Sequence, residues 1–362
     1  MTCIAVDEQA DEPLLIIFVL SGIRNEQSYA GIAQTSRKLT SGLSSRGLRV
    51  VPFDPLDYPD RLTQEACLAG ALHEIFDRLT NGRPRRVHIE LLDTEGLKVA
   101  YFCRKWRLPY SVTHHNIDPF LSPEVRDARI SEMAHYMRHA TATICFDRRH
   151  GDSLRSLGIQ TLLPASYGID TSMFAPTRRR EDIADHLLKD EDHDHIILYS
   201  GRLIAEKGCR RLAELRPIIQ EHKCCLVVAG DGPLLGELQE AMPWAYFLGA
   251  LDLECLAELY ATADILLMPS RNETYSTVVG EAMASGMVVV TERCGASDSL
   301  ISDTENGFVV NDDSGEDISG CLLRALRVTA AWPGIRAKAR SAASGLHWQA
   351  CFQRYYRSII QA

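Results

Sequence analysis

The chain has 362 residues, more than a single hydrophobic core usually encloses, so its length predicts two domains. Its composition, 46% hydrophobic and 24% charged without a low-complexity tract, is typical of a globular protein. Residues 1–180 hold 23 basic and 21 acidic side chains, a net charge of +2, and the remainder carries −11. Neither half has the strong positive charge of a nucleic-acid-binding surface, so no nucleic-acid partner is expected.

The first apolar run, residues 14–20, is expected to form a buried strand. Seven residues are too few to cross a bilayer, and the acidic residues before them are the reverse of a signal peptide's basic start. The eleven cysteines, an odd number without a C-x-x-C pair, argue against a zinc ribbon or a disulfide framework. The chain is therefore expected to be cytoplasmic.

Short β-branched or leucine-rich runs alternate with longer amphipathic stretches along the whole chain, as in βαβ units. A helix is expected over residues 31–45, closed by Gly47. The expected strands are residues 14–20, 49–53, 86–90, 110–113 and 143–146 in the first half, and 196–200, 225–229, 245–248, 265–268, 288–291 and 307–310 in the second. The pattern predicts an α/β protein with two doubly wound, Rossmann-like domains facing a cleft, with ligand at the C-terminal ends of the strands.

The domain boundary is expected near residue 180. Residues 176–194 are rich in charge and are predicted to link two domains, residues 1–180 and residues 181–345. The closing segment, residues 346–362, contains an amphipathic helix with aromatic anchors.

The strongest chemical signal lies in residues 269–286, where an expected strand ends in a loop and a helix follows. Glu273 lies in the loop, and Glu281 lies eight residues later on the helix. Three residues open this helix: Tyr275, Ser276 and Thr277. Its free N–H groups suit a phosphate, and carboxylates beside it can accept sugar or ribose hydroxyls. A glutamate near a helix start also often only caps the helix, so that alternative stays open.

A second segment follows the expected strand 196–200. Arg202 and Lys207 lie on the loop that opens the next helix, at the carboxyl end of that strand. Two fixed cations there can neutralise a diphosphate leaving group without a metal. Exposed Arg and Lys are common on loops, which leaves a purely solvated role as the alternative.

Two further glycine and histidine segments end strands. Gly232 belongs to a G-D-G-P turn, but its G-x-G-x-x-x-G spacing to Gly236 disfavours a nicotinamide site and fits a tight βα turn. His114 and His115 follow the strand 110–113, and only one is expected to face substrate because neighbouring side chains on a strand alternate. A histidine satisfied by its own loop is the alternative.

No metal site is expected. Adjacent histidines do not easily ligate one ion, and no further ligand cluster accompanies them. Asp192 and Asp194 form a D-x-D sequence, but it precedes a strand inside an acidic stretch, which favours a solvated charge run.

Together, and in this order, these segments resemble the family 4 retaining glycosyltransferases of the GT-B fold. The similarity covers most of the chain and is densest over residues 196–310. It rests on the E-x7-E element from Glu273 to Glu281 with the following A-M-A-S-G run, the G-R and E-K-G loop of residues 201–208, the G-D-G-P turn of residues 230–233, and the P-x5-H spacing from Pro109 to His115. The last spacing selects His115 over His114. The C-terminal helix resembles the family's segment that crosses back onto the first lobe.

The resemblance implies roles for individual residues. Arg202 and Lys207 would hold the diphosphate, Glu281 the ribose, and Glu273 the donor sugar. His115 would contact the sugar near the reacting carbon. The departures from the family pattern include two beside the expected phosphate: Tyr275-Ser276 replaces F-G, and Ala30-Gly31 replaces the G-G loop that places Gly31 near the phosphate.

The implied activity is transfer of a hexose-type sugar, with retention and without metal, from a nucleoside diphosphate to a hydroxyl of a glycan, lipid or small molecule. A UDP-sugar is favoured as donor, a GDP-sugar is next, and no further cofactor is expected. A peripheral contact with the cytoplasmic face of a membrane stays open. Alternatives are a GT-B sugar-nucleotide epimerase, a pseudo-glycosyltransferase, and a non-catalytic scaffold that binds nucleotide sugars.

Overall fold

The computed structural model describes residues 15–19, 36–46, 48–53, 73–74, 77, 86–90, 94–115, 123–146, 148–164, 167–189, 193–271, 273 and 275–360. The chain divides into two compact units. The first unit comprises Met1–Cys145, Gly151–Ala165 and Phe352–Ala362, and the second comprises Phe146–His150 and Ser166–Cys351. Residues 166–180 thus pack within the second unit, whereas the boundary drawn from the sequence lies at residue 180. The division into domains of residues 1–180 and 181–345 stays a prediction.

The first unit contains a six-stranded parallel sheet in the order β2-β1-β3-β4-β5-β6. Its strands are β1 (Leu15–Val19), β2 (Arg49–Phe53), β3 (Arg86–Ile89), β4 (Tyr110–Thr113), β5 (Ala142–Cys145) and β6 (Leu162–Pro164). Five of them coincide with the expected strands. The sixth, β6, was not expected, because three residues ending in a proline give no strand pattern and form a strand only by pairing with β5.

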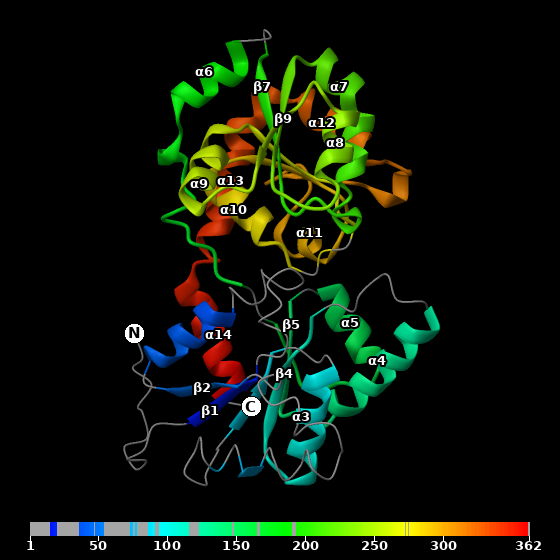
Figure 1. Ribbon diagram of the computed structural model, residues 1–362, viewed down its shortest axis with the longest axis vertical. Helices are drawn as coiled ribbons and strands as arrows, with labels where there is room; N and C mark the ends of the chain where they lie inside the picture. The colour runs from blue at the N-terminus through cyan, green and yellow to red at the C-terminus, as the bar shows by residue number, and fades with distance from the viewer. Residues whose placement is uncertain are drawn as a thin grey trace. The chain divides into compact units, whose positions relative to one another are not determined.

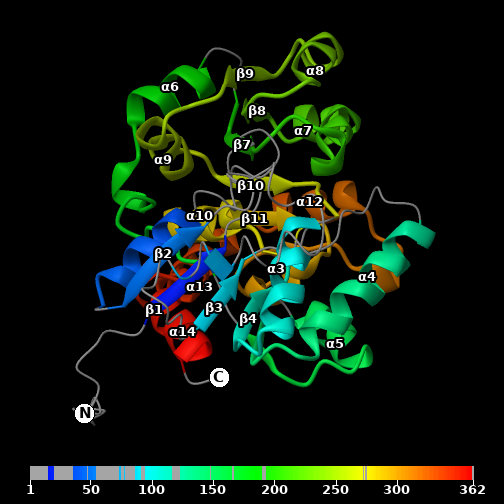
Figure 2. The same ribbon diagram turned by 60° about the horizontal axis from the view of Figure 1, so that its bottom comes forward.

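Helices cover both faces of the first sheet. One face packs against α3 (Thr94–Lys105), α4 (Pro123–Met137) and α5 (Arg148–Ser156). On the other face, α14 (Trp348–Ile360) lies along β1 and β3 (Figure 2). Residues 36–44 are helical within the expected helix 31–45, and a Cβ on Gly42 would lie 2.2 Å from the ring of Phe352 on α14. Residues 31–35 and Gly47 lie outside the described residues.

The second unit contains another six-stranded parallel sheet, in the order β12-β11-β10-β7-β8-β9. Its strands are β7 (His195–Ser200), β8 (Cys224–Ala229), β9 (Tyr246–Gly249), β10 (Ile265–Met268), β11 (Val288–Thr291) and β12 (Phe308–Val309). All six were expected from the sequence. They are continuous apolar runs because both faces of a parallel sheet are buried.

Two helical layers enclose the second sheet (Figure 1). One layer contains α9 (Leu253–Thr262), α10 (Thr277–Ser285) and α13 (Trp332–Ser344). The opposite layer contains α7 (Arg216–Glu221), α8 (Leu235–Ala241) and α12 (Ile318–Leu326). A further helix, α11 (Gly295–Leu300), follows β11.

The segment expected to be a linker is partly a packed helix. Helix α6 (Glu181–Lys189) buries Ala184 and Leu187 in the core of the second unit. Charged residues surround these two positions, so the apolar face, with its spacing of three to four residues, was not recognised in the sequence.

The strand orders locate the points at which the direction of winding reverses. In the second sheet this switch point lies between β7 and β10, and in the first it lies between β1 and β3. Ligands of doubly wound sheets bind beside the carboxyl ends of the strands at such points. In the described part of the chain, helices are too short or too polar for a membrane span.

Candidate functional site

Two loops meet at the carboxyl edge of the second sheet beside its switch point, one following β7 and the other following β8. The Gly201 amide donates to Ala229 O at 3.0 Å, and the Leu203 amide donates to Asp231 O at 2.9 Å. A Cβ on Gly232 would lie 2.6 Å from Leu203 O, and φ of Gly232 is +158°. Gly232 is therefore required for the close approach of the two loops, because only a residue without a side chain fits there.

The loop after β10 is held against the loop after β7. Gly208 adopts φ +67°, and a Cβ there would lie 2.4 Å from Pro269 O. The Ser270 hydroxyl donates to Glu206 O at 3.4 Å. These contacts bring the two expected donor-binding segments together although 60 residues of chain separate them.

The contact between these loops ends in an ion pair between two predicted site residues. Lys207 Nζ lies 2.5 Å from Glu273 Oε1, and the side chains are 32% and 13% exposed. The ammonium group has three protons, so Lys207 can contact an anion while it stays beside Glu273. The pair thus places a partly shielded cation and a sugar-hydroxyl acceptor side by side at the carboxyl edge of the sheet.

Helix α10 begins beside this pair. Ser276 is the N-cap, and its hydroxyl accepts a hydrogen bond from the Val279 amide at 3.3 Å. The buried Ser276 hydroxyl is occupied by capping the helix. The groups that can bind a phosphate are therefore backbone amides of the first turn, which starts at Thr277. The cap of α10 is thus Ser276, while Glu273 lies before the helix.

Tyr275 is anchored within the second unit. Its hydroxyl donates to Tyr167 O at 3.0 Å, and its ring meets that of Tyr167 edge to face with centroids 5.4 Å apart. The phenol that replaces the family's phenylalanine therefore fixes the loop before α10 through a hydrogen bond.

Glu281 is half-buried on α10, near Tyr260 of α9. Burial, and then the negative charge of Glu281, hold the pKa of Tyr260 well above its ordinary value.

Arg202 is exposed, and the Tyr199 hydroxyl donates to its carbonyl oxygen at 3.0 Å. The backbone that carries Arg202 is therefore fixed, and its side chain reaches solvent at the switch point.

Sequence reasoning missed a buried carboxylate next to these loops. Glu292, directly after β11, is 2% exposed and forms an ion pair with Arg211, and its Oε2 lies 3.4 Å from Arg271 Nε. Arg211 also donates to Pro269 O at 3.4 Å. Glu292 could have been recognised in the sequence as a charged residue at the carboxyl end of an apolar strand. This network braces the loop that carries Glu273.

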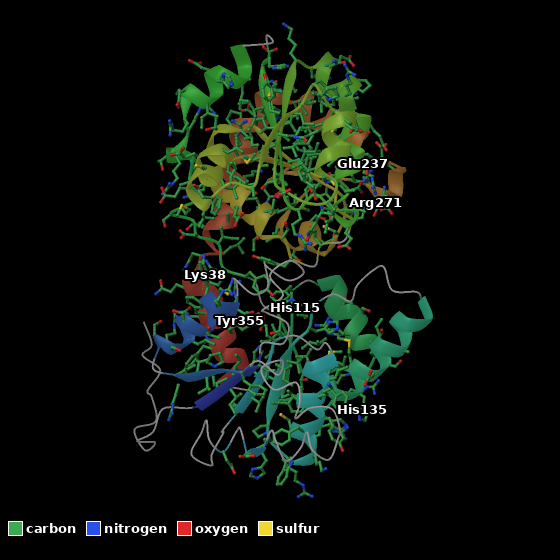
Figure 3. All side chains as sticks on the ribbon, in the orientation of Figure 1. Lys38, His115, His135, Glu237, Arg271 and Tyr355 are labelled. Atoms are coloured by element: carbon green, nitrogen blue, oxygen red, sulfur yellow. The ribbon has the colours of Figure 1, made fainter. Side chains whose placement is uncertain are left out.

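His115 belongs to the first unit, where it lies just beyond β4 (Figure 3). Its Nε2 lies 3.5 Å from Glu90 Oε1, and its side chain is 10% exposed. His114 is buried, and its amide donates to Ile144 O at 3.0 Å, which extends the sheet by one residue. His115 is thus the more accessible of the two.

The remaining expectations concern Gly31 and a metal. Gly31 and Asp192 lie outside the described residues. Among the residues that the structure does describe, groups of three or more His, Cys, Asp or Glu side chains with metal-binding geometry are absent. The His193 ring contacts Leu187 O at 3.3 Å, within the second unit.

Comparison with solved structures defines the class of fold. The crystal structure of Anabaena HepE in complex with UDP matches 96% of this chain and 100% of its own with a TM-score of 0.75, at 17% identity. Two parallel, doubly wound sheets of this kind constitute the GT-B fold of glycosyltransferases.

Sequence comparison then finds a family match within the second unit. Residues 194–327 match the family Glycosyl transferases group 1. A GDP-mannose-dependent alpha-mannosyltransferase of Corynebacterium glutamicum is 35% identical over 225 residues, 58% of this chain and 50% of that protein. One of Mycobacterium tuberculosis is 34% identical over 176 residues, 49% of this chain and 45% of that protein. The chain thus spans half or less of the length of these relatives.

Proposed function

We propose that this protein is a retaining glycosyltransferase that moves a sugar from a nucleoside diphosphate to an acceptor hydroxyl without a metal. The observation that carries the proposal is the Lys207–Glu273 pair at the switch point of a Glycosyl transferases group 1 domain. A cation, a carboxylate and the first turn of α10 lie together there, and these groups recognise a diphosphate and a sugar.

The proposed roles are those that the family resemblance implies. Lys207 and Arg202 bind the diphosphate and stabilise the charge that develops on it as the glycosidic carbon–oxygen bond breaks. Glu273 accepts hydrogen bonds from sugar hydroxyls, and Glu281 does so from the ribose. The acceptor oxygen attacks the same face of the sugar, and its proton passes to the departing phosphate oxygen, so retention needs no separate base. His115 contacts the sugar.

We further propose GDP-mannose as the donor. The sequence analysis favoured UDP and placed GDP next, but neither the spacing nor the type of the site residues reports the base. Two relatives whose names specify GDP-mannose are 34–35% identical to this chain, and this similarity supports GDP over UDP. The acceptor is a hydroxyl of a glycan, lipid or small molecule.

The direct test is a transfer assay with GDP-mannose, UDP-glucose and UDP-galactose against a panel of hydroxyl acceptors, read by mass spectrometry. The proposal predicts a product heavier by one hexose, with the donor's anomeric configuration in its NMR coupling constant. Inversion would refute the retaining mechanism. Conversion of the donor sugar without acceptor would instead indicate the epimerase, and tight donor binding without turnover would indicate the scaffold.

A further inference from the structure

A buried polar network lies at the switch point of the first sheet, on strands β3 and β4. His88 of β3 pairs in register with Ser111 of β4, and Glu90 follows β3 directly. His88, Glu90 and Ser111 are all at most 2% exposed. Only His115, at the end of this network, reaches the surface.

The polar contacts of the network form a continuous path. The Ser111 hydroxyl lies 2.9 Å from His88 Nδ1, and the Thr113 hydroxyl lies 3.0 Å from His88 Nε2. His88 Nε2 lies 3.1 Å from Glu90 Oε2, and Glu90 Oε1 lies 3.5 Å from His115 Nε2. One carboxylate thus lies between two imidazoles, and each imidazole faces a different oxygen.

The inner imidazole is held from several sides. Besides Ser111, Thr113 and Glu90, the ring of Tyr355 on α14 meets His88 edge to face at 6.3 Å between centroids. Tyr355 is fully buried. Because His88 is fixed by strand, helix and hydroxyl contacts, the Glu90 carboxylate that it contacts has little freedom to turn. A carboxylate held in this way can in turn restrict the orientation of the His115 ring, which lies next in the path.

The Glu90 carboxylate is charged despite its burial. Burial alone would raise its pKa, but the hydrogen bonds of His115 and then of His88 lower it to about 2. A buried charge of this kind is weak evidence for stability, since well-packed apolar residues often do as well. A more specific role is orientation, as in catalytic histidines whose ring is held by a buried carboxylate.

We propose that Glu90 is a positioning residue for His115: its carboxylate fixes the orientation of the ring through the 3.5 Å contact between Oε1 and Nε2, and His88 holds the carboxylate in place by a hydrogen bond to Oε2. The inference rests on the proposed function, in which His115 contacts the donor sugar. Glu90 itself does not touch the substrate in this account. Its removal therefore changes how well His115 is presented and leaves the binding of the diphosphate in the second unit intact.

The first test reads the contact without any activity. In protein labelled with ¹⁵N-histidine, the His115 Nε2–H signal, assigned by its loss in His115→Ala, is expected to be protected from exchange. Glu90→Gln should shift this signal and speed its exchange with water. The matched control is Glu316→Gln, which removes a half-buried carboxylate paired with Arg324 in the second unit. An unchanged His115 signal in Glu90→Gln would overturn the proposal.

The second test reads the consequence for turnover. Glu90→Gln should lower kcat about 10–100-fold, the usual cost of losing an orienting partner, while KM for the donor changes less than about threefold. The double variant Glu90→Gln/His115→Ala should be no slower than His115→Ala alone, because both act through one ring. Independent, multiplicative losses would overturn the proposal.

The tests remain decisive if Glu90→Gln does not fold or if the wild-type protein shows no turnover. If Glu90→Gln does not fold by circular dichroism, Glu90→Asp, which keeps the charge and withdraws it by one methylene, should give the same effects at smaller size. If the wild-type protein shows no turnover with any donor, the transferase proposal fails, whereas the exchange measurement still decides whether Glu90 positions His115.

Discussion

Lys207 and Glu273 lie 66 residues apart in the chain, and the ammonium Nζ of one lies 2.5 Å from the carboxylate Oε1 of the other. The contact joins the loop after β7 to the loop before α10 at the point where the second sheet reverses its winding. Its partial burial makes it more than an ordinary surface ion pair, because a ligand entering there meets charges already oriented.

Replacing Lys207 by Ala should remove one preorganised charge from the leaving group and cost on the order of 2–4 kcal/mol of transition-state stabilisation. At 25 °C this lowers kcat/KM roughly 30- to 1000-fold. Arg210→Ala is the matched control, because Arg210 is a half-exposed cation three residues away that pairs with Glu237. An unaltered kcat/KM in Lys207→Ala would remove Lys207 from the site.

Gly232→Ala should destabilise the second unit. The new Cβ would press on Leu203 O, and a positive φ costs a side-chain-bearing residue about 1–3 kcal/mol. Gly236→Ala serves as the control, because a Cβ there meets nothing within 4 Å and helical Ala is favoured over Gly by up to about 1 kcal/mol. Thermal unfolding should thus move in opposite directions for the two variants. Equal Tm values would contradict the close approach of the two loops.

Glu292→Gln should loosen the loop that carries Glu273. The substitution takes the charge from the ion pair with Arg211 and the contact with Arg271, which costs about 1–3 kcal/mol in unfolding free energy. We expect a higher KM for the donor as well, since Arg211 also holds Pro269 O. Glu237→Gln, in an exposed pair, should change neither quantity. Stability lost without any change in KM would show that the network does not support the site.

The lowered pKa of Glu90 predicts a pH dependence of stability. The unfolded carboxyl, with its ordinary pKa near 4.5, binds a proton at higher pH than the folded one, whose pKa is about 2. Its contribution, about 3 kcal/mol, is therefore fully present above pH 4.5 and is lost as pH falls toward 2. The Tm difference between wild type and Glu90→Gln should shrink over that range, and a constant difference would contradict the charged state.

Transfer should survive EDTA. In the proposed function, Arg202 and Lys207 would provide the positive charge that a divalent ion would otherwise supply to the diphosphate. Turnover is compared before and after chelation and after addition of Mn²⁺. A strict need for Mn²⁺ would instead give Asp192 and Asp194 a role in metal binding.

Sequence periodicity predicted the second sheet completely and most of the first, because buried parallel strands are short apolar runs bounded by turns. Strand β6 escaped because its three residues become a strand only through pairing with β5. Helix α6 escaped because the charged residues around Ala184 and Leu187 masked its apolar face. In both cases tertiary packing decides the structure where local signal is weak.

The loops after β7 and β10 were selected in the sequence because their residues stand at strand ends, and the structure brings the two loops together. Their binding of a donor stays a prediction. Glu90 was not predicted as part of the site, since its meaning depends on a register that pairs β3 with β4 and on the burial provided by α14. Glu292 was missed for a similar reason, because its partners Arg211 and Arg271 come from two other segments of the chain. Long-range partners of this kind leave no spacing pattern in a single sequence.

The most direct measurement is isothermal titration of the purified protein with GDP, UDP, ADP and CMP in EDTA. The account predicts micromolar binding of GDP, weakened by Arg202→Ala and by Lys207→Ala and unchanged by Arg210→Ala. Binding of UDP in its place would keep the site and correct the donor. Binding of none of the four nucleotides would contradict the assignment of a nucleotide-sugar site to the loops after β7 and β10.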